Sequence, residues 1–202
     1  MKPYLFFLIP VFLLAGAGEP ERDLYVLSRG YTVTIAGTSN LRDWKESVSQ
    51  VSGAMEAEVN ADGSIALHSI RISMEVLSIK SDMGRLMDNK TYEALKAADH
   101  PEILFTLSTP MNLTQVRDCE RAIPVKGSLL LAGVCKPVTM LVKTIEVSQG
   151  KLQFEGCENL RMTDFGVRPP SALFGTMRAS PDITIHFKTN FINQSISNNL
   201  KN

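Results

Sequence analysis

Apolar and polar residues alternate along most of this sequence, and this two-residue period is typical of half-buried β-strands. About eight such runs follow one another, at residues 24–37, 51–59, 65–76, 103–108, 125–133, 138–142, 152–162 and 183–187. Short turns join several of them, such as Asp62-Gly63 and Ser148–Lys151. Strands and helices do not alternate, which disfavours a parallel sheet. The pattern therefore predicts an all-β fold, an eight-stranded antiparallel β-barrel whose closure removes exposed strand edges.

Two departures from the period predict local features of this barrel. The apolar parity changes near His68-Ser69, which indicates a β-bulge that would help to curve the sheet. Residues 133–137 are expected to form a turn that contains Pro137.

Residues 81–96 change to a helical period and predict one inserted α-helix. Ser81 or Asp82 is expected to cap its N-terminus. The residue before a proline avoids the helical region, so His100-Pro101 ends the helical stretch. The apolar stripe is expected to contact the core: Met83, Leu86, Met87, Ala94 and Leu95.

The inward faces of the strands are almost entirely apolar, which leaves two interpretations open. One is a packed core, and the other is a hollow tube that holds one small ligand. Methionines suit an adaptable lining, and Gly53 and Gly156 on inward faces would leave space or let another backbone approach. The hypothesised lining residues are Val33, Ile35, Met55, Ile72, Met74, Ile103, Phe105, Leu129, Leu131, Met140, Phe154, Met162, Ile185 and Phe187.

An apolar loop around Pro169-Pro170 is expected to close one end of the barrel. Phe165 and Phe174 are hypothesised to shape the mouth of the binding site there. Trp44 has two interpretations, as a core anchor at the end of the barrel or as a wall of this mouth. All three are counted with the candidate ligand-binding residues.

The first residues form a different kind of segment. Residues 1–17 combine Lys2, an apolar stretch from Tyr4 to Leu14 and the small residues Ala15–Ala17, which is typical of a cleaved secretory signal peptide. About a dozen apolar residues are too few to span a bilayer. The expected organisation is a signal peptide at 1–17, a barrel domain at 18–191 and a polar, frayed tail at 192–202. A periplasmic or secreted location follows from it.

Charge and motifs disfavour several function classes. The 21 basic and 21 acidic residues balance, so neither nucleic acid nor an anionic membrane surface is an expected partner. His68, His100 and His186 show no metal-ligand spacing, and there is no nucleophile elbow or phosphate-binding glycine loop. Asp164 is a candidate general base without an evident partner. We therefore expect no catalytic residue, metal or cofactor.

The chain has three cysteines, Cys119, Cys135 and Cys157. An odd number leaves at least one thiol unpaired. Their different heights along the expected strands favour free, partly buried thiols.

Several segments together resemble the YceI family, in family order over residues 24 to 190. They are Gly37-Thr38-Ser39-Asn40-Leu41 with Asp43-Trp44, Leu95-Lys96 before Pro101, Ile103 and Phe105, Gly127 and Leu129, Gly133 with Lys136-Pro137-Val138, and Met162-Thr163-Asp164-Phe165-Gly166 with Pro169-Pro170. The resemblance implies a lipocalin-like barrel, export to the periplasm and binding of a polyisoprenoid or similar long-chain lipid.

The expected function is therefore an exported carrier of a long apolar ligand and not an enzyme. Lys80, Arg85 and Lys90 are candidates for contacting a polar head group, although exposed lysines are usually solvated. Two alternatives remain: a stress-response or interaction protein with a filled barrel, and a lipid-modifying enzyme that uses Asp164. The oligomeric state is left open, with a homodimer among the options.

Overall fold

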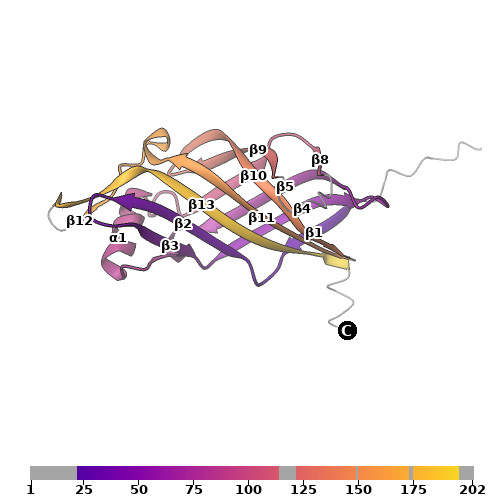
Figure 1. The fold of residues 1–202 in the computed structure, drawn as a ribbon, viewed down its shortest axis with the longest axis horizontal. Coiled ribbons are helices and arrows are strands. Elements are labelled where there is room, and N and C mark those ends of the chain that lie inside the picture. The colour runs from indigo at the N-terminus through magenta and orange to yellow at the C-terminus, as the bar shows by residue number, and fades with distance from the viewer. Residues whose placement is uncertain (1–21, 114–121, 149, 173–174, 196–202) are drawn as a thin grey trace, which may run out of the picture.

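The computed structural model describes residues 22–113, 122–148, 150–172 and 175–195. These residues form strands, one α-helix and two short 3-10 turns (Figure 1). The elements are β1 (Asp23–Leu27), β2 (Thr32–Ser39), β3 (Trp44–Val48), β4 (Val51–Val59), β5 (Ile65–Glu75), η1 (Val76–Ser78), β6 (Ile79–Ser81), α1 (Arg85–Ala94), β7 (Glu102–Leu107), β8 (Met111–Leu113), β9 (Ile123–Leu131), β10 (Val134–Ser148), β11 (Lys151–Arg161), η2 (Met162–Phe165), β12 (Ser171–Ala172) and β13 (Met177–Asn193).

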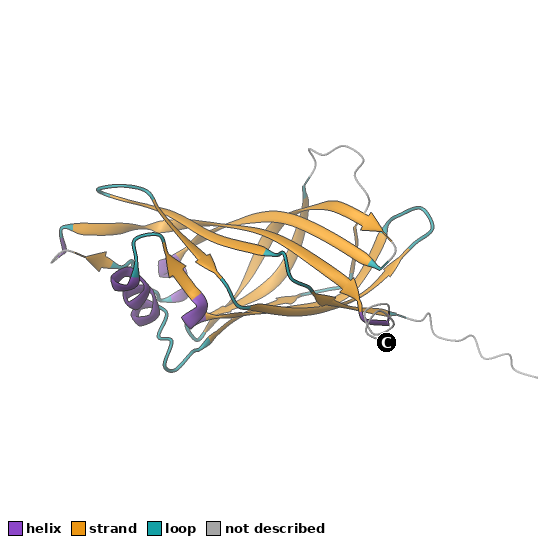
Figure 2. Cartoon of the chain, turned by 90° about the horizontal axis from the view of Figure 1, so that it is seen from below, coloured by secondary structure: helices purple, strands orange, loops and turns teal. Residues whose placement is uncertain are grey.

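The sheet closes into an antiparallel barrel of eight strands. Its strands pair in the order β1-β4-β5-β7-β9-β10-β11-β13, and β1 also pairs with β13, which completes the ring. Figure 2 shows an elongated barrel with α1 at one end. The expected all-β, eight-stranded barrel with one inserted helix is confirmed.

The last strand, β13, connects the two ends of the barrel. Its first part pairs with β2 from Ala179 to Lys188, and its end pairs with β1 from Phe191 to Asn193. The expected single strand at 24–37 is therefore two strands, separated by residues 28–31. On the far side of β2, β3 and β6 extend the wall toward α1.

The change of apolar parity near His68 is a β-bulge, as expected. Glu56 pairs with Ser69 and Ala57 pairs with Leu67, so His68 is the extra residue on β5. The expected turn at 133–137 is wrong in its extent. Ala132 and Gly133 alone make the turn, both at positive φ (50° and 84°), and Leu131 already pairs with Val134. This is the backbone that two-residue hairpins require.

Pro137 consequently lies inside β10 and not in a turn. Pairing of β10 with β11 runs from Leu141 to Ser148, so within the described chain Pro137 has a strand partner only in β9. A residue without an N–H is tolerated where one side of a strand is unpaired.

The helix differs from its expected form at both ends. It runs only from Arg85 to Ala94, and Gly84, at φ 86°, occupies the N-cap position without a side-chain cap. The expected cap by Ser81 or Asp82 is wrong because the helix begins only after Gly84, and the Ser81 hydroxyl accepts the Met83 N–H at 3.1 Å at the end of β6. Leu86 is 64% exposed and therefore does not belong to the buried stripe.

Some expectations fall on residues that the structure does not describe. These are the signal peptide at 1–17, Cys119, Phe174 and the end of the tail at 196–202. Within the tail that was expected from Ile192 on, β13 continues to Asn193, which is buried opposite Tyr25. Cys135 and Cys157 are free thiols; Cys135 is exposed and Cys157 is partly buried. None of the helices in the described ranges is long and apolar enough to cross a bilayer.

Candidate functional site

Two apolar cavities lie inside the barrel. The first, of about 90 Å³, lies at the end that carries α1, and the second, of about 120 Å³, lies between the central strands. On this measure a single water needs only about 10–15 Å³. Both cavities are therefore much larger than a packing defect. Five residues line both of them and form their common wall: Val33, Met74, Leu129, Leu160 and Ile185.

Large side chains of neighbouring strands cover the inward-facing glycines around the second cavity. A Cβ on Gly53 would lie 2.7 Å from Cδ1 of Ile72, and a Cβ on Gly156 would lie 2.5 Å from Cζ of Phe187. The ring of Phe105 covers Gly127 in the same way. The expectation that Gly53 and Gly156 leave open space is therefore wrong. The alternative, that another backbone approaches them, is confirmed, because a Cβ on Gly156 would lie 2.5 Å from the Leu141 carbonyl oxygen and a Cβ on Gly53 would lie 3.1 Å from that of Arg71.

These covering side chains all line the second cavity: Ile72, Phe105 and Phe187. The glycines let them lie flat against the sheet, an arrangement known as aromatic rescue when the side chain is a ring. Space remains inside because these groups extend across the wall instead of into the centre.

Trp44 forms part of the wall of the first cavity. Its indole lies directly over Gly37 of the neighbouring strand β2, where a Cβ would collide with the ring. The indole Nε1 donates to the Thr38 carbonyl at 3.1 Å, which fixes the ring. Trp44 also packs against the buried core, so its position agrees with both interpretations, and its role as a ligand contact stays a prediction.

Helix α1 and its flanking residues cover one side of the first cavity. Met83, Met87, Thr91, Ala94 and Leu95 line it. Sequence reasoning assigned the apolar members of this stripe to the core and did not place them at a cavity. The helical spacing was visible, but only the tertiary structure shows that there is unfilled space beneath it.

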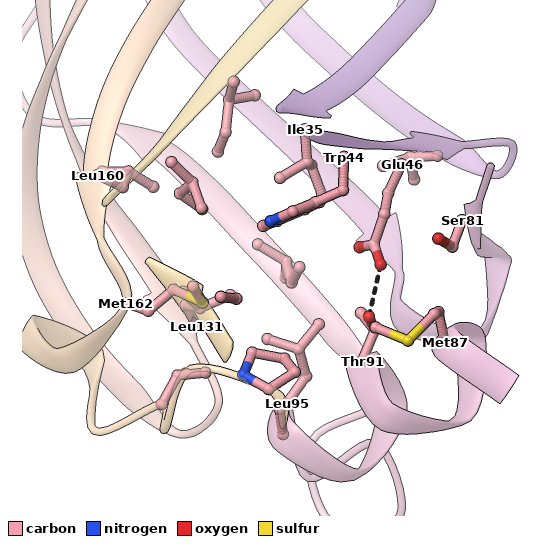
Figure 3. Close-up of a pocket in the computed structure, with 18 of the residues that line it drawn as sticks. Ile35, Trp44, Glu46, Ser81, Met87, Thr91, Leu95, Leu131, Leu160 and Met162 are labelled. Atoms are coloured by element: carbon pink, nitrogen blue, oxygen red, sulfur yellow. Dashed lines mark hydrogen bonds between the residues drawn. The ribbon is translucent and has the colours of Figure 1, made fainter. Parts of the chain in front are cut away.

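Glu46 is a buried carboxyl group in the first cavity that sequence reasoning missed (Figure 3). It is 5% exposed, and the Thr91 hydroxyl donates a hydrogen bond to its Oε1 at 2.6 Å. Burial raises the pKa of Glu46, the Thr91 hydrogen bond lowers it, and the nearby charges of Asp88 and Asp82 raise it further. One signal was available, because Glu46 has the same parity as Trp44 and Val48 on its strand.

Fifteen of the seventeen candidate residues line one or both cavities. They are Val33, Ile35, Trp44, Met55, Ile72, Met74, Ile103, Phe105, Leu129, Leu131, Met140, Phe154, Met162, Ile185 and Phe187. Phe165 is buried but lines neither cavity, and Phe174 lies outside the described residues. Val167, Pro170 and Met177 take the place at this end that was expected for the two phenylalanines. The role of all these residues as ligand contacts stays a prediction.

The cationic candidates do not line either cavity. Lys80 Nζ lies 3.5 Å from Asp88 Oδ2 and donates to the Tyr92 hydroxyl at 2.5 Å. Lys90 pairs with Glu93 at 3.0 Å on the same helix, and Arg85 is exposed. Asp164, the candidate general base, is exposed on η2 and lines neither cavity. In the described ranges, no group of three or more His, Cys, Asp or Glu residues is arranged to hold a metal ion.

Solved structures share this fold at low sequence identity. A polyisoprenoid-binding domain from Saccharophagus degradans, implicated in plant cell wall breakdown, matches with a TM-score of 0.63 and 10% identity over 86% of this chain and 99% of its own. Burkholderia cenocepacia BcnA matches with a TM-score of 0.58 and 16% identity, covering 79% and 95% of the two chains. A Campylobacter jejuni YceI protein matches with a TM-score of 0.55 and 16% identity, covering 72% and 82%.

A comparison with curated protein sequences gave no match. The model of the YceI-like domain, in contrast, matches residues 31–191, which is most of the chain and includes both cavities. This protein therefore belongs to the YceI family.

Proposed function

We propose that this protein is an exported, non-catalytic carrier that holds a polyisoprenoid or similar long-chain lipid inside its barrel. The observation that carries this proposal is the pair of apolar cavities with a common wall in a closed barrel. The polyisoprenoid-binding domain with the same fold adds support. Export follows from the signal-peptide pattern of residues 1–17.

The chemistry of the lining favours an apolar chain over a polar substrate. Burial of a hydrocarbon contributes about 0.8 kcal/mol per methylene, so a long chain binds without many specific contacts. Methionines at Met55, Met74 and Met140 supply flexible side chains that adapt to such a chain. The filled-barrel alternative has less support, because both cavities exceed the space of several waters.

The proposal is tested by organic extraction of the protein purified from its native host, with mass analysis of the extract. We expect a long-chain lipid at close to one molecule per protein. Recovery of no lipid, together with failure of the delipidated protein to take up polyprenols, would reject the carrier function.

A matched pair of variants tests whether the ligand lies in the cavities. Val33→Phe adds bulk at the common wall and should reduce the lipid recovered, whereas Ile145→Phe adds the same ring type at an exposed position outside both cavities. The melting temperatures of both variants control for the loss of stability that overpacking causes, which is about 1–3 kcal/mol. Equal lipid content in two folded variants would place the ligand elsewhere.

A further inference from the structure

The first cavity has a polar corner, and Ser39 is the one other polar residue among its largely apolar lining. Its polar members Glu46, Ser81 and Thr91 come from β3, β6 and α1, and Figure 3 shows the Glu46 carboxyl directed toward Thr91. Glu46 and Ser81 are partners in the β3–β6 pairing, and Thr91 contacts Glu46 from the helix above them. Three elements therefore bring polar groups to one place in the cavity.

Neither cavity is lined by a lysine or an arginine, and each has one carboxyl group, Glu46 or Glu158. Burial raises the pKa of both carboxyls, although a backbone hydrogen bond from Thr139 lowers that of Glu158. Within the described chain, no basic group lies within salt-bridge distance of Glu46, and Thr91 is its one side-chain hydrogen-bond partner. A buried carboxyl in such surroundings favours its neutral form, which has an O–H to donate.

The charged groups on the elements packed around Glu46 do not favour its ionised form over its neutral form. Strand β2 has none, Lys45 on β3 is exposed, and Lys80 on β6 pairs with Asp88. On and before α1, Arg85 and Asp82 are exposed, and Lys90 pairs with Glu93. The two nearest acids, Asp82 and Asp88, both act on Glu46 as like charges. An anionic head group would therefore be buried beside negative charge without a cation, which is strongly unfavourable.

We propose that Glu46 and Thr91 bind the polar end of the ligand, and that this end is an uncharged hydroxyl or carbonyl group and not a phosphate or a carboxylate. The apolar chain then passes the common wall of Val33, Leu129 and Ile185 into the second cavity. This inference rests on the proposed carrier function and adds the chemical class of the ligand's polar end.

Probes with one chain and different ends test the inference. We would compare a polyprenol and the polyprenyl phosphate of equal length, added to the delipidated protein. Trp44, the only tryptophan, lines the same cavity and reports binding through its fluorescence. The alcohol should bind at least about tenfold more tightly than the phosphate.

Variants of Glu46 separate hydrogen bonding from general damage to the cavity. Glu46→Leu should weaken the alcohol about tenfold and leave a polyprene hydrocarbon of equal length unchanged. Glu46→Gln keeps shape and a donor, so it should retain the alcohol within about threefold and reduce the discrimination against the phosphate. Glu155→Gln, at an exposed position on β11, is the matched control and should change neither affinity.

The outcomes distinguish this inference from the function on which it rests. If none of the probes binds, the carrier function fails and the head-group assignment fails with it. If the phosphate binds as tightly as the alcohol, or if Glu46→Leu leaves the alcohol unaffected, the carrier function stands and the assignment is wrong.

Discussion

Single residues decide how much space the barrel encloses. Gly37 leaves room for Trp44, and Gly127 leaves room for Phe105, because an added Cβ at either glycine would collide with the ring. The large side chains then lie against the wall instead of filling the interior. Glu46 and Glu158 are the two carboxyl groups that interrupt the apolar interior, and the burial of Glu46 has a measurable cost.

The ionisation of Glu46 should make the stability of the fold depend on pH. Its pKa is raised in the folded state, chiefly by burial, so the neutral carboxyl favours the folded form. That contribution is complete below the unfolded-state pKa and is lost as pH rises through the folded-state pKa. Glutamine stays neutral, so the melting temperature of Glu46→Gln relative to wild type should rise from about pH 4 to about pH 8.

Thermal melts of wild type, Glu46→Gln and Glu155→Gln across this range provide the check. Glu155 is exposed, so its variant should follow the wild type at each pH. A constant difference between Glu46→Gln and wild type would show that Glu46 does not titrate abnormally in the folded protein.

Among the elements, α1 has the most specific attachment. Asp88 accepts the backbone N–H of Ser81 at 2.7 Å and pairs with Lys80, both from β6. The Tyr92 hydroxyl lies 2.9 and 2.8 Å from the carbonyl oxygens of Leu77 and Ile79. Thr91 completes the attachment through Glu46 on β3. The helix is thus held by polar groups on its flank, while Met87 on the helix and Met83 before it line the cavity.

Loss of the Asp88 carboxylate should loosen this attachment. Asp88→Ala leaves the partly buried Ser81 N–H without its acceptor, and an unmade hydrogen bond of this kind costs about 1–3 kcal/mol. The free energy of unfolding from a denaturant titration measures this loss. Glu93→Ala is the control on the same helix, since Glu93 is exposed and its pair with Lys90 contributes little. Equal losses in both variants would contradict the assigned role of Asp88.

At the scale of the whole molecule, β13 holds the barrel together. Its middle, from Ile183 to Lys188, pairs with β2 on one side and β11 on the other, and its end pairs with β1 and β11. Strands β6 and β12, by comparison, are short and lie at the edge. Closure therefore depends on one strand that forms close to the end of the chain.

Amide hydrogen exchange should reflect this arrangement. We expect residues 183–188 to exchange at least about a hundredfold more slowly than residues 79–81 and 171–172, because only global unfolding exposes strands paired on both sides. Exchange measured by mass spectrometry on peptides that cover these segments gives the comparison. Equal protection throughout would indicate that the short strands open only with the whole barrel.

The sequence by itself determined the barrel, the bulge at His68 and part of the cavity lining, since fifteen of the predicted candidates line a cavity. These depend on the parity of side chains along a strand, and parity is local. The sequence could not determine that large side chains cover the inward glycines, or that the apolar stripe of α1 lines a cavity. Nor could it determine that Glu46 lies between its strand partners Ile35 and Ser81 and contacts Thr91 of the helix. Those features depend on which strands become neighbours and how far their registers shift, and only the closed sheet sets these distances.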